Sequence, residues 1–203
     1  SGGGGANLSV QYGPNNTNGY PDKAETDGVI GKATLSWKPN EDLMYYLTWS
    51  EGFRPGLLNR PAGTSNGAGY TIPAVTDTDE VTNFEFGWKA TLMDGALRFN
   101  GSAYMVDISG LQSTIFDASI VNLFFSDNAA DAEITGVEGD FVYVAGNGLM
   151  LSGAFSLLDT ELTKSLVPTS DIVVGSELAF APGYQGNLAA RKEWSMSGGN
   201  TGH

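Results

Sequence analysis

Hydrophobic and polar residues alternate with a period of two over most of this chain. From Phe84 to Leu92 apolar residues occupy the even positions, and the alternation resumes from Leu97 to Met105 after a Met-Asp-Gly sequence at 93–95. Successive side chains of a strand point to opposite faces, so this period predicts strands with one apolar and one polar face. Met-Asp-Gly is typical of a tight hairpin turn. The pattern therefore predicts an all-β chain.

The alternation predicts about eight long strands arranged as an antiparallel up-and-down meander. They are expected at residues 6–12, 27–38, 43–53, 80–92, 96–107, 131–144, 149–160 and 182–194. A strand of about 11 residues that is tilted by about 45° spans the apolar band of an outer membrane. No helix is expected.

The predicted connections alternate strictly between short and long. Turns at 39–42, 93–95 and 145–148 are short, and the connections at 13–26, 54–79, 108–130 and 161–181 are long. Long loops without secondary structure are uncommon in compact soluble domains. Short turns on one side and long loops on the other are typical of a transmembrane β-barrel. The sequence therefore favours a segment of such a barrel, or a small closed one.

A soluble β-sandwich, or an oligomeric β-sheet module, is the alternative interpretation. Such a module would bind glycans or protein partners through surface aromatic residues such as Tyr70 or Trp88. Small residues on the apolar faces, including Gly31, Gly101 and Gly153, argue against it, because they would fill a sandwich core poorly. Unpaired outer strands would also allow self-association through the edges of the sheet.

Composition excludes several classes of function. The 203 residues contain no cysteine, and the one histidine is His203, so a thiol nucleophile, a cysteine zinc site and a Ser-His-Asp triad are excluded. A net charge of −13 argues against a nucleic-acid partner. The acidic loops lack EF-hand spacing and are expected to be solvated surface charge. We expect no enzyme activity, no catalytic residue, no cofactor and no metal site.

The two ends of the chain differ in composition from the region between them. Residues 1–5 form a Gly/Ser linker-like tail, and residues 195–203 are similar to a linker or tag. Residues 6–194 are expected to form the β-barrel segment.

One stretch resembles a known family. Residues 45–56, YYLTWSEGFRPG, are similar to the strand that ends in Y-x-S-x-G-F-R-x-G in the barrels of TonB-dependent outer-membrane receptors. The preceding residues 37–43, WKPNEDL, resemble the periplasmic turn W-x-P-x-D-x-L of that family.

Three later stretches agree with this resemblance in the same order. Residues 80–89 and 92–100, EVTNFEFGWK and LMDGALRFN, are similar to a hairpin of the family. Residues 128–140, NAADAEITGVEGD, resemble N-A-x-x-A-x-x-x-G-V-E-x-E. Residues 180–184, FAPGY, resemble the sequence before a late strand. The resemblance covers about residues 27–194.

The resemblance implies the bacterial outer membrane as the location and energy-coupled uptake of a scarce solute as the function. The solute would be a siderophore, a vitamin or an oligosaccharide, and outer-membrane lipid would surround the barrel. The family's plug domain, TonB box and terminal strand have no counterpart here. The chain is therefore expected to be an internal segment of the C-terminal half of the barrel, not competent for transport alone, and to reach TonB only through regions that it lacks.

Candidate functional residues come from the family motif and from the polar face of the strands. A polar side chain inside such a barrel would contact the passing solute or the plug, or would serve the wall as an ion pair. Arg54 is expected to pair with a carboxylate such as Glu51 or Glu85. The candidates are Glu51, Phe53, Arg54, Glu85, Lys89, Arg98, Asn100, Glu138 and Asp140.

Overall fold

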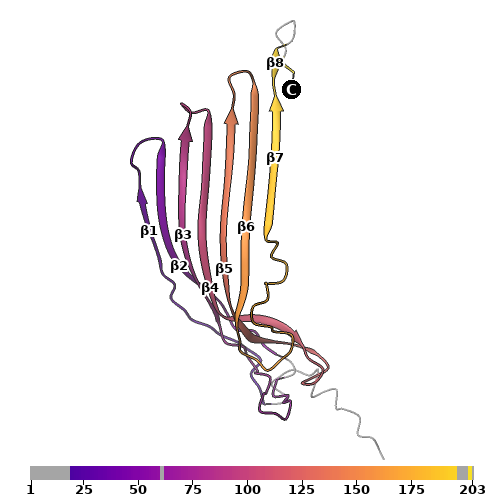
Figure 1. The fold of residues 1–203 in the computed structure, drawn as a ribbon. Helices are drawn as coiled ribbons and strands as arrows, with labels where there is room; N and C mark the ends of the chain where they lie inside the picture. Colours follow the sequence, from indigo (N-terminus) through magenta and orange to yellow (C-terminus); the bar gives the residue numbers. More distant parts are fainter. Residues whose placement is uncertain (1–18, 60–61, 196–200, 203) are drawn as a thin grey trace, which may run out of the picture.

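A single antiparallel sheet of seven strands in sequence order dominates the structure (Figure 1). The computed structural model describes residues 19–59, 62–195 and 201–202. The strands of the sheet are β1 (Lys32–Trp37), β2 (Leu43–Arg54), β3 (Asp79–Leu92), β4 (Leu97–Phe116), β5 (Phe124–Val144), β6 (Leu149–Ser165) and β7 (Tyr184–Lys192). A separate ribbon pairs β8 (Trp194–Ser195) with β9 (Thr201–Gly202).

The predicted all-β meander is confirmed. The strand expected at 6–12 lies outside the described residues. Within the described ranges no helix is long and apolar enough to cross a membrane. The sheet is open, because β1 and β7 lie at its two edges and do not pair with each other. Across the part of the chain that the structure describes, it is therefore a curved segment and not a small closed barrel.

The two ends of the sheet differ in the length of the connections between strands (Figure 1). At the turn end, short turns join β1 to β2, β3 to β4 and β5 to β6. At the loop end lie the connections 55–78, 117–123 and 166–183. The long loop predicted at 108–130 is wrong, because β4 continues to Phe116 and β5 begins at Phe124. The register shifts between Ile108 and Gln112, which interrupts the period of two on which the prediction relied.

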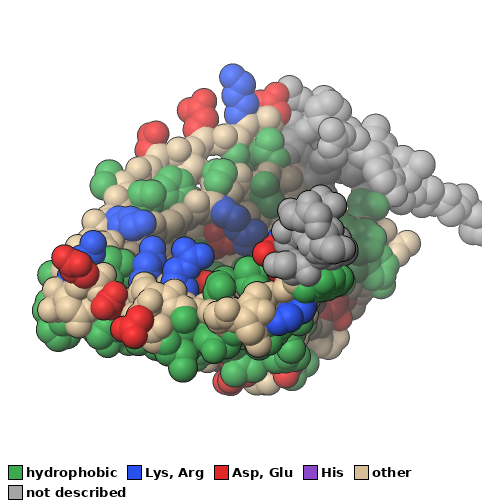
Figure 2. Space-filling model, turned by 90° about the horizontal axis from the view of Figure 1, so that it is seen from above, with side chains coloured by type: hydrophobic (Ala, Val, Ile, Leu, Met, Phe, Trp, Pro, Cys, Tyr) green, Lys and Arg blue, Asp and Glu red, His purple; other side chains and the backbone are tan. Residues whose placement is uncertain are grey.

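The two faces of the sheet have opposite chemistry. Viewed from the turn end, the sheet curves around a hollow that holds Lys and Arg side chains, while hydrophobic side chains line its outer surface (Figure 2). The register places Lys89, Asn100 and Asp140 side by side on the concave face. It places Leu47 and Phe86 together on the convex face. No second sheet among the described residues covers the convex face, so the sandwich alternative finds no support.

The convex apolar residues form a band of limited height. In β3 they run from Phe84 to Leu92, about 27 Å along a strand. Tilted by roughly 40°, this length spans roughly 20 Å, close to the apolar band of about 25 Å in membrane barrels. Towards the loop end the band stops at a row of carboxylates, formed by Glu51, Asp107, Glu133 and Glu161, with Thr82 of β3 between the first two.

Glycines in the sheet lie directly opposite aromatic residues. Trp88 is the register partner of Gly101, and a Cβ on Gly101 would meet the Trp88 ring and, at 2.8 Å, the carbonyl oxygen of Glu138. The missing side chain therefore leaves the space in which the neighbouring ring lies. The same relationship joins Tyr46 to Gly87, Tyr104 to Gly136, Phe155 to Gly139 and Phe141 to Gly153.

The larger cluster of buried apolar residues lies at the loop end of the sheet. Ile72 of the connection 55–78 packs with Ile115 and Phe125 of the β4–β5 hairpin and with Val167. Most side chains of the wall nearer the turn end are exposed or partly exposed on both faces. Three segments far apart in sequence are therefore held together at one end of the sheet (Figure 1).

Candidate functional site

A polar groove of about 870 Å³ runs along the concave face. Strands β2 to β7 all contribute to it, because directly paired residues of neighbouring strands point to the same side. Four of the predicted residues, Lys89, Asn100, Glu138 and Asp140, line this groove. Arg98 lines an adjoining pocket nearer the turn end, together with Lys89 and Asn100.

Side-chain hydrogen bonds fix the orientation of two carboxylates on the concave face, Asp140 in the groove and Glu85 beside it. Asn100 Nδ2 donates to Asp140 Oδ2 at 3.1 Å, and Tyr46 donates its hydroxyl proton to Glu85 Oε1 at 2.6 Å. Glu85 lies on the same concave face as Lys89, because the two residues are four apart in β3. The groove thus presents carboxylates, amides and one ammonium group. It can hydrogen-bond a polar solute or a protein surface in the hollow.

Glu51 and Phe53 do not belong to the groove. Their position in β2 places them on the convex face, opposite in direction to Ser50 and Arg54. Glu51 Oε2 accepts a hydrogen bond from the backbone N–H of Gly31 at 3.0 Å, and the Phe53 ring lies against Gly28. Among the described residues no three Asp, Glu, His or Cys side chains converge to hold a metal ion.

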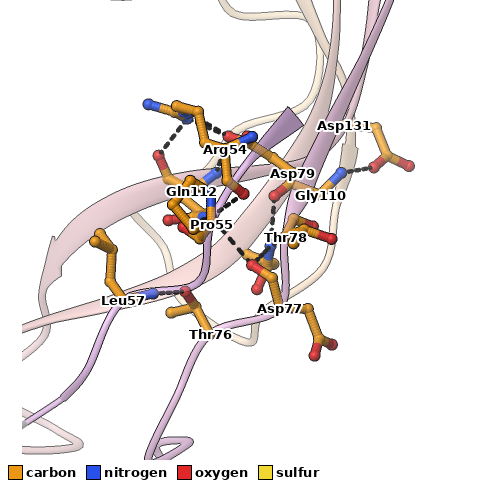
Figure 3. Close-up of polar contacts among 11 residues, drawn as sticks. Arg54, Pro55, Leu57, Thr76, Asp77, Thr78, Asp79, Gly110, Gln112 and Asp131 are labelled. Carbon is orange, nitrogen blue, oxygen red and sulfur yellow. Dashed lines mark hydrogen bonds and ion pairs between the residues drawn. The ribbon is translucent and has the colours of Figure 1, made fainter. Parts of the chain in front are cut away.

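Arg54 pairs with Asp79, and the predicted partners Glu51 and Glu85 are wrong (Figure 3). β2 and β3 are in a register that sets residue 54 opposite residue 79, whereas Glu85 lies opposite Thr48. Arg54 Nε donates to Asp79 Oδ2 at 2.7 Å, Nη2 donates to the same oxygen, and the Arg54 backbone N–H donates to Oδ1 at 3.1 Å. The Asp79 side chain is 1% exposed.

The pKa of Asp79 is set by opposing effects. The group lies on the loop side of the carboxylate row, outside the apolar band. Burial raises its pKa, but the hydrogen bonds and charge of Arg54 and the backbone N–H of Gln112 outweigh burial and lower the pKa below the ordinary value. Asp79 is therefore a carboxylate that joins two strands where they enter the connection 55–78.

Two carboxamides outside the list of predicted candidates hold this connection in place, and that of Gln112 is labelled in Figure 3. Gln112 Nε2 donates to the carbonyl oxygens of Pro55 at 3.0 Å and Asp77 at 3.1 Å. Asn128 Nδ2 donates to the carbonyl oxygens of Asp77 at 3.0 Å and Gly110 at 2.7 Å. Both ends of the connection 55–78 are therefore fastened to the β4–β5 hairpin.

A third carboxamide and a tyrosine fasten the middle of the same connection. Asn59 exchanges hydrogen bonds with the backbone of Ser126, at 2.6 Å to the carbonyl oxygen and 2.7 Å from the N–H. Tyr70 donates its hydroxyl proton to Asp127 Oδ2 at 2.5 Å. Burial, followed by the hydrogen bond and charge of Asp127, raises the pKa of Tyr70 above its ordinary value. These two contacts could not be predicted, because Ser126 and Asp127 lie in the part of the β4–β5 hairpin that was expected to be the loop 108–130.

The sequence profile of the family described as TonB dependent receptor-like, beta-barrel matches residues 3–202. The chain belongs to this family. Membership, together with the sheet, places it in the bacterial outer membrane as part of a TonB-dependent receptor barrel. A curated relative is the probable TonB-dependent siderophore receptor PiuA of Acinetobacter baumannii, 23% identical over 146 residues, which is 72% of this chain and 19% of the relative.

Solved structures share the fold of this sheet. The ferric yersiniabactin uptake receptor FyuA of Yersinia pestis superposes with a TM-score of 0.59 at 15% identity, over 83% of this chain and 23% of FyuA. BauA, the ferric preacinetobactin receptor of Acinetobacter baumannii, gives a TM-score of 0.56 at 22% identity, over 82% of this chain and 23% of BauA. The chain thus spans about one fifth of the length of these relatives.

Proposed function

We propose that this chain is part of the barrel wall of a receptor that imports a ferric siderophore through the outer membrane with energy supplied by TonB. The observation that carries the proposal is the polar groove on the concave face, backed by an apolar band on the convex face. The names of the relatives PiuA and FyuA favour a ferric siderophore over a vitamin or an oligosaccharide.

The groove residues would contact either the solute or the plug domain that fills such barrels. Lys89, Asn100, Glu138 and Asp140 provide the polar surface for this contact. The segment would not transport on its own, because its free edges at β1 and β7 leave the wall open. In a whole receptor these edges would pair with further strands, and TonB would be engaged by other regions. Without such strands the edges would allow self-association.

Uptake by the full-length protein tests the proposal. In cells that lack other iron receptors, the full-length protein is expected to import radioactive iron as ferric siderophores, and deletion of TonB is expected to abolish this uptake. Replacing Glu138→Gln together with Asp140→Asn should lower the initial rate by roughly tenfold, since two charged contacts in the groove are lost. The matched control, Glu41→Gln with Asp94→Asn, removes two carboxylates at the turn end and should leave uptake unchanged.

Three outcomes would contradict parts of this proposal. Uptake of cobalamin or oligosaccharides without uptake of any ferric siderophore would replace the solute class. Uptake that persists without TonB would contradict the energy coupling. Equal loss of uptake in the groove variant and the turn variant would show that the groove carboxylates have no special role.

A further inference from the structure

The connection between β6 and β7, residues 166–183, folds over the concave face at the loop end. The backbone N–H of Leu178 donates to Thr160 Oγ1 at 2.9 Å, and Thr160 is buried. Ile172 and Leu178 pack against a cluster that contains Ala132 and Leu162. The connection therefore covers part of the wall on the groove side.

The wall beneath this connection is apolar, unlike the rest of the concave face. Ile108, Ala132 and Leu162 are direct register partners on β4, β5 and β6. They share the direction of the groove residues Asn100 and Asp140, because no register shift separates them along the strands. The connection 166–183 explains why an apolar patch lies in a hollow lined by charged groups. Its residues Ile172 and Leu178 cover the patch and exclude water from it.

The two long connections are attached in different ways. The connection 55–78 is fastened by the Arg54–Asp79 ion pair and by the carboxamides of Asn59, Gln112 and Asn128. In contrast, the connection 166–183 is attached through apolar side chains: Val167 is buried in the core beside its start, and Ile172 and Leu178, both partly buried, pack on the concave wall.

Backbone hydrogen bonds supplement this packing at the edge of β6. Leu162 exchanges two of them with the connection, donating to Ser176 at 2.9 Å and accepting from Gly175 at 2.8 Å. Val173 and Val174 of the same segment point outward, at 57% and 54% exposed. Segments with few buried contacts open before better-packed ones. After Val167 no side chain of this connection is fully buried, so the part from 168 onward is the part that opens more easily.

We propose that Ile172 and Leu178 form a latch, which holds the connection 166–183 down on the apolar patch of Ile108, Ala132 and Leu162. Releasing the latch uncovers this apolar patch on the concave face, between the groove and the loop end, while the connection 55–78 stays fastened by the Arg54–Asp79 ion pair. The consequence for solute access rests on the proposed function. The latch itself depends only on the contact between this connection and the sheet.

Cysteine labelling tests the latch directly, because the chain has no cysteine of its own. Ala132→Cys places a thiol beneath the connection, at a position 3% exposed. In outer membranes that carry the full-length protein, a membrane-impermeant maleimide should label this thiol slowly. Adding Ile172→Ser and Leu178→Ser should raise the labelling rate at least about tenfold, since the cover loses its apolar contacts. The matched control, Val173→Ser with Val174→Ser, changes two exposed residues of the same segment and should leave the rate unchanged.

Hydrogen exchange separates release of the latch from general unfolding. In the Ile172→Ser and Leu178→Ser variant, the amides of Gly175 and Leu178 should lose protection, whereas the amide of Arg54, bonded to Asp79, should keep it. Fast labelling of Ala132→Cys without any change in the connection would overturn the proposal, as would an unchanged rate in the double serine variant. If uptake of every tested solute is absent but labelling behaves as expected, the latch stands and the proposed function fails.

Discussion

Arg54, the last residue of β2, holds both carboxylate oxygens of Asp79, the first residue of β3, at the point where the chain leaves the sheet for the connection 55–78. The link ties two strands whose ends are separated in sequence by the whole connection. It also gives the backbone N–H of Gln112 an acceptor at 3.4 Å, so β4 is joined to the same carboxylate. Three strands therefore converge on one buried side chain.

Replacing Asp79→Asn is expected to loosen the connection 55–78. The amide keeps the shape of the side chain but loses the charge that pairs with Arg54, at a cost of about 2 kcal/mol for charged hydrogen bonds. Hydrogen exchange at the amides of Arg54 and Thr76 should become roughly 30-fold faster. Glu80→Gln removes the neighbouring exposed charge and is the control. Equal exchange in both variants would contradict the role of Asp79.

Alkaline pH is expected to weaken the contact between Tyr70 and Asp127. The folded pKa of Tyr70 is raised above its ordinary value of 10, so the contribution of this pair to stability is complete below pH 10 and is lost as the pH rises through the raised pKa. Subtracting the 295 nm titration of Tyr70→Phe from that of the unchanged protein isolates this phenol. The difference should stay flat at pH 10, where an ordinary phenol is half ionised. In Asp127→Asn it should begin to rise at lower pH, and half ionisation of Tyr70 at pH 10 in the unchanged protein would refute the assignment.

Gly101→Ala is expected to destabilise the sheet, whereas Gly52→Ala is not. A Cβ at residue 101 would meet the Trp88 ring and the carbonyl oxygen of Glu138, which corresponds to overpacking by about 1–3 kcal/mol. Gly52 lies in β2 with no atom within 4 Å of its Cβ position, so alanine there should be neutral or stabilising. Urea-unfolding midpoints of the full-length protein compare the two. Equal midpoints would show that the ring does not need the space above Gly101.

Leu47→Lys and Thr48→Lys test the two faces with neighbouring residues of one strand. Leu47 is on the convex face and 55% exposed there, while Thr48 faces the hollow. A lysine on the lipid side should cost about 2 kcal/mol and reduce the amount of folded protein in the outer membrane. A lysine facing the hollow should be tolerated. Folded protein can be quantified by its altered gel mobility before and after heating. If Thr48→Lys caused the larger loss, the assignment of the two faces would have to be reversed.

The period of two predicted the strands and their faces well where lipid requires an apolar side. From Phe84 to Leu92 the alternation is clean, because each convex residue is apolar. Beyond the carboxylate row this requirement ends, so the polar residues of β4 and β5 no longer signal a strand, and the bulges near Ile108 and Gln112 break the period. The loop prediction at 108–130 failed for this physical reason.

Contacts across the connection 55–78 could not be predicted from the sequence. The pairing of Arg54 with Asp79 depends on the register between β2 and β3, and a long connection leaves that register open. The groove residues Lys89, Asn100 and Asp140 were predicted to share one face from the alternation within each strand, and the short turn between β3 and β4 sets Lys89 opposite Asn100. A short turn fixes the register of the two strands that it joins, whereas a long connection does not.

Within the band, neighbouring side chains of a strand alternate between lipid and water. The side that each residue faces therefore depends on whether its position in the strand is odd or even. Inserting or deleting one residue between Phe84 and Leu92 would turn every following side chain of β3 from lipid to water or from water to lipid until the strand ends. Only insertions or deletions of an even number of residues leave the directions of the following side chains unchanged. The bulges lie in β4 beyond the carboxylate row, between Ile108 and Gln112, where the convex side no longer faces lipid and a change of one residue carries no such penalty. Length variation in barrels of this kind is therefore expected in the turns and beyond the carboxylate row, while the band keeps its length.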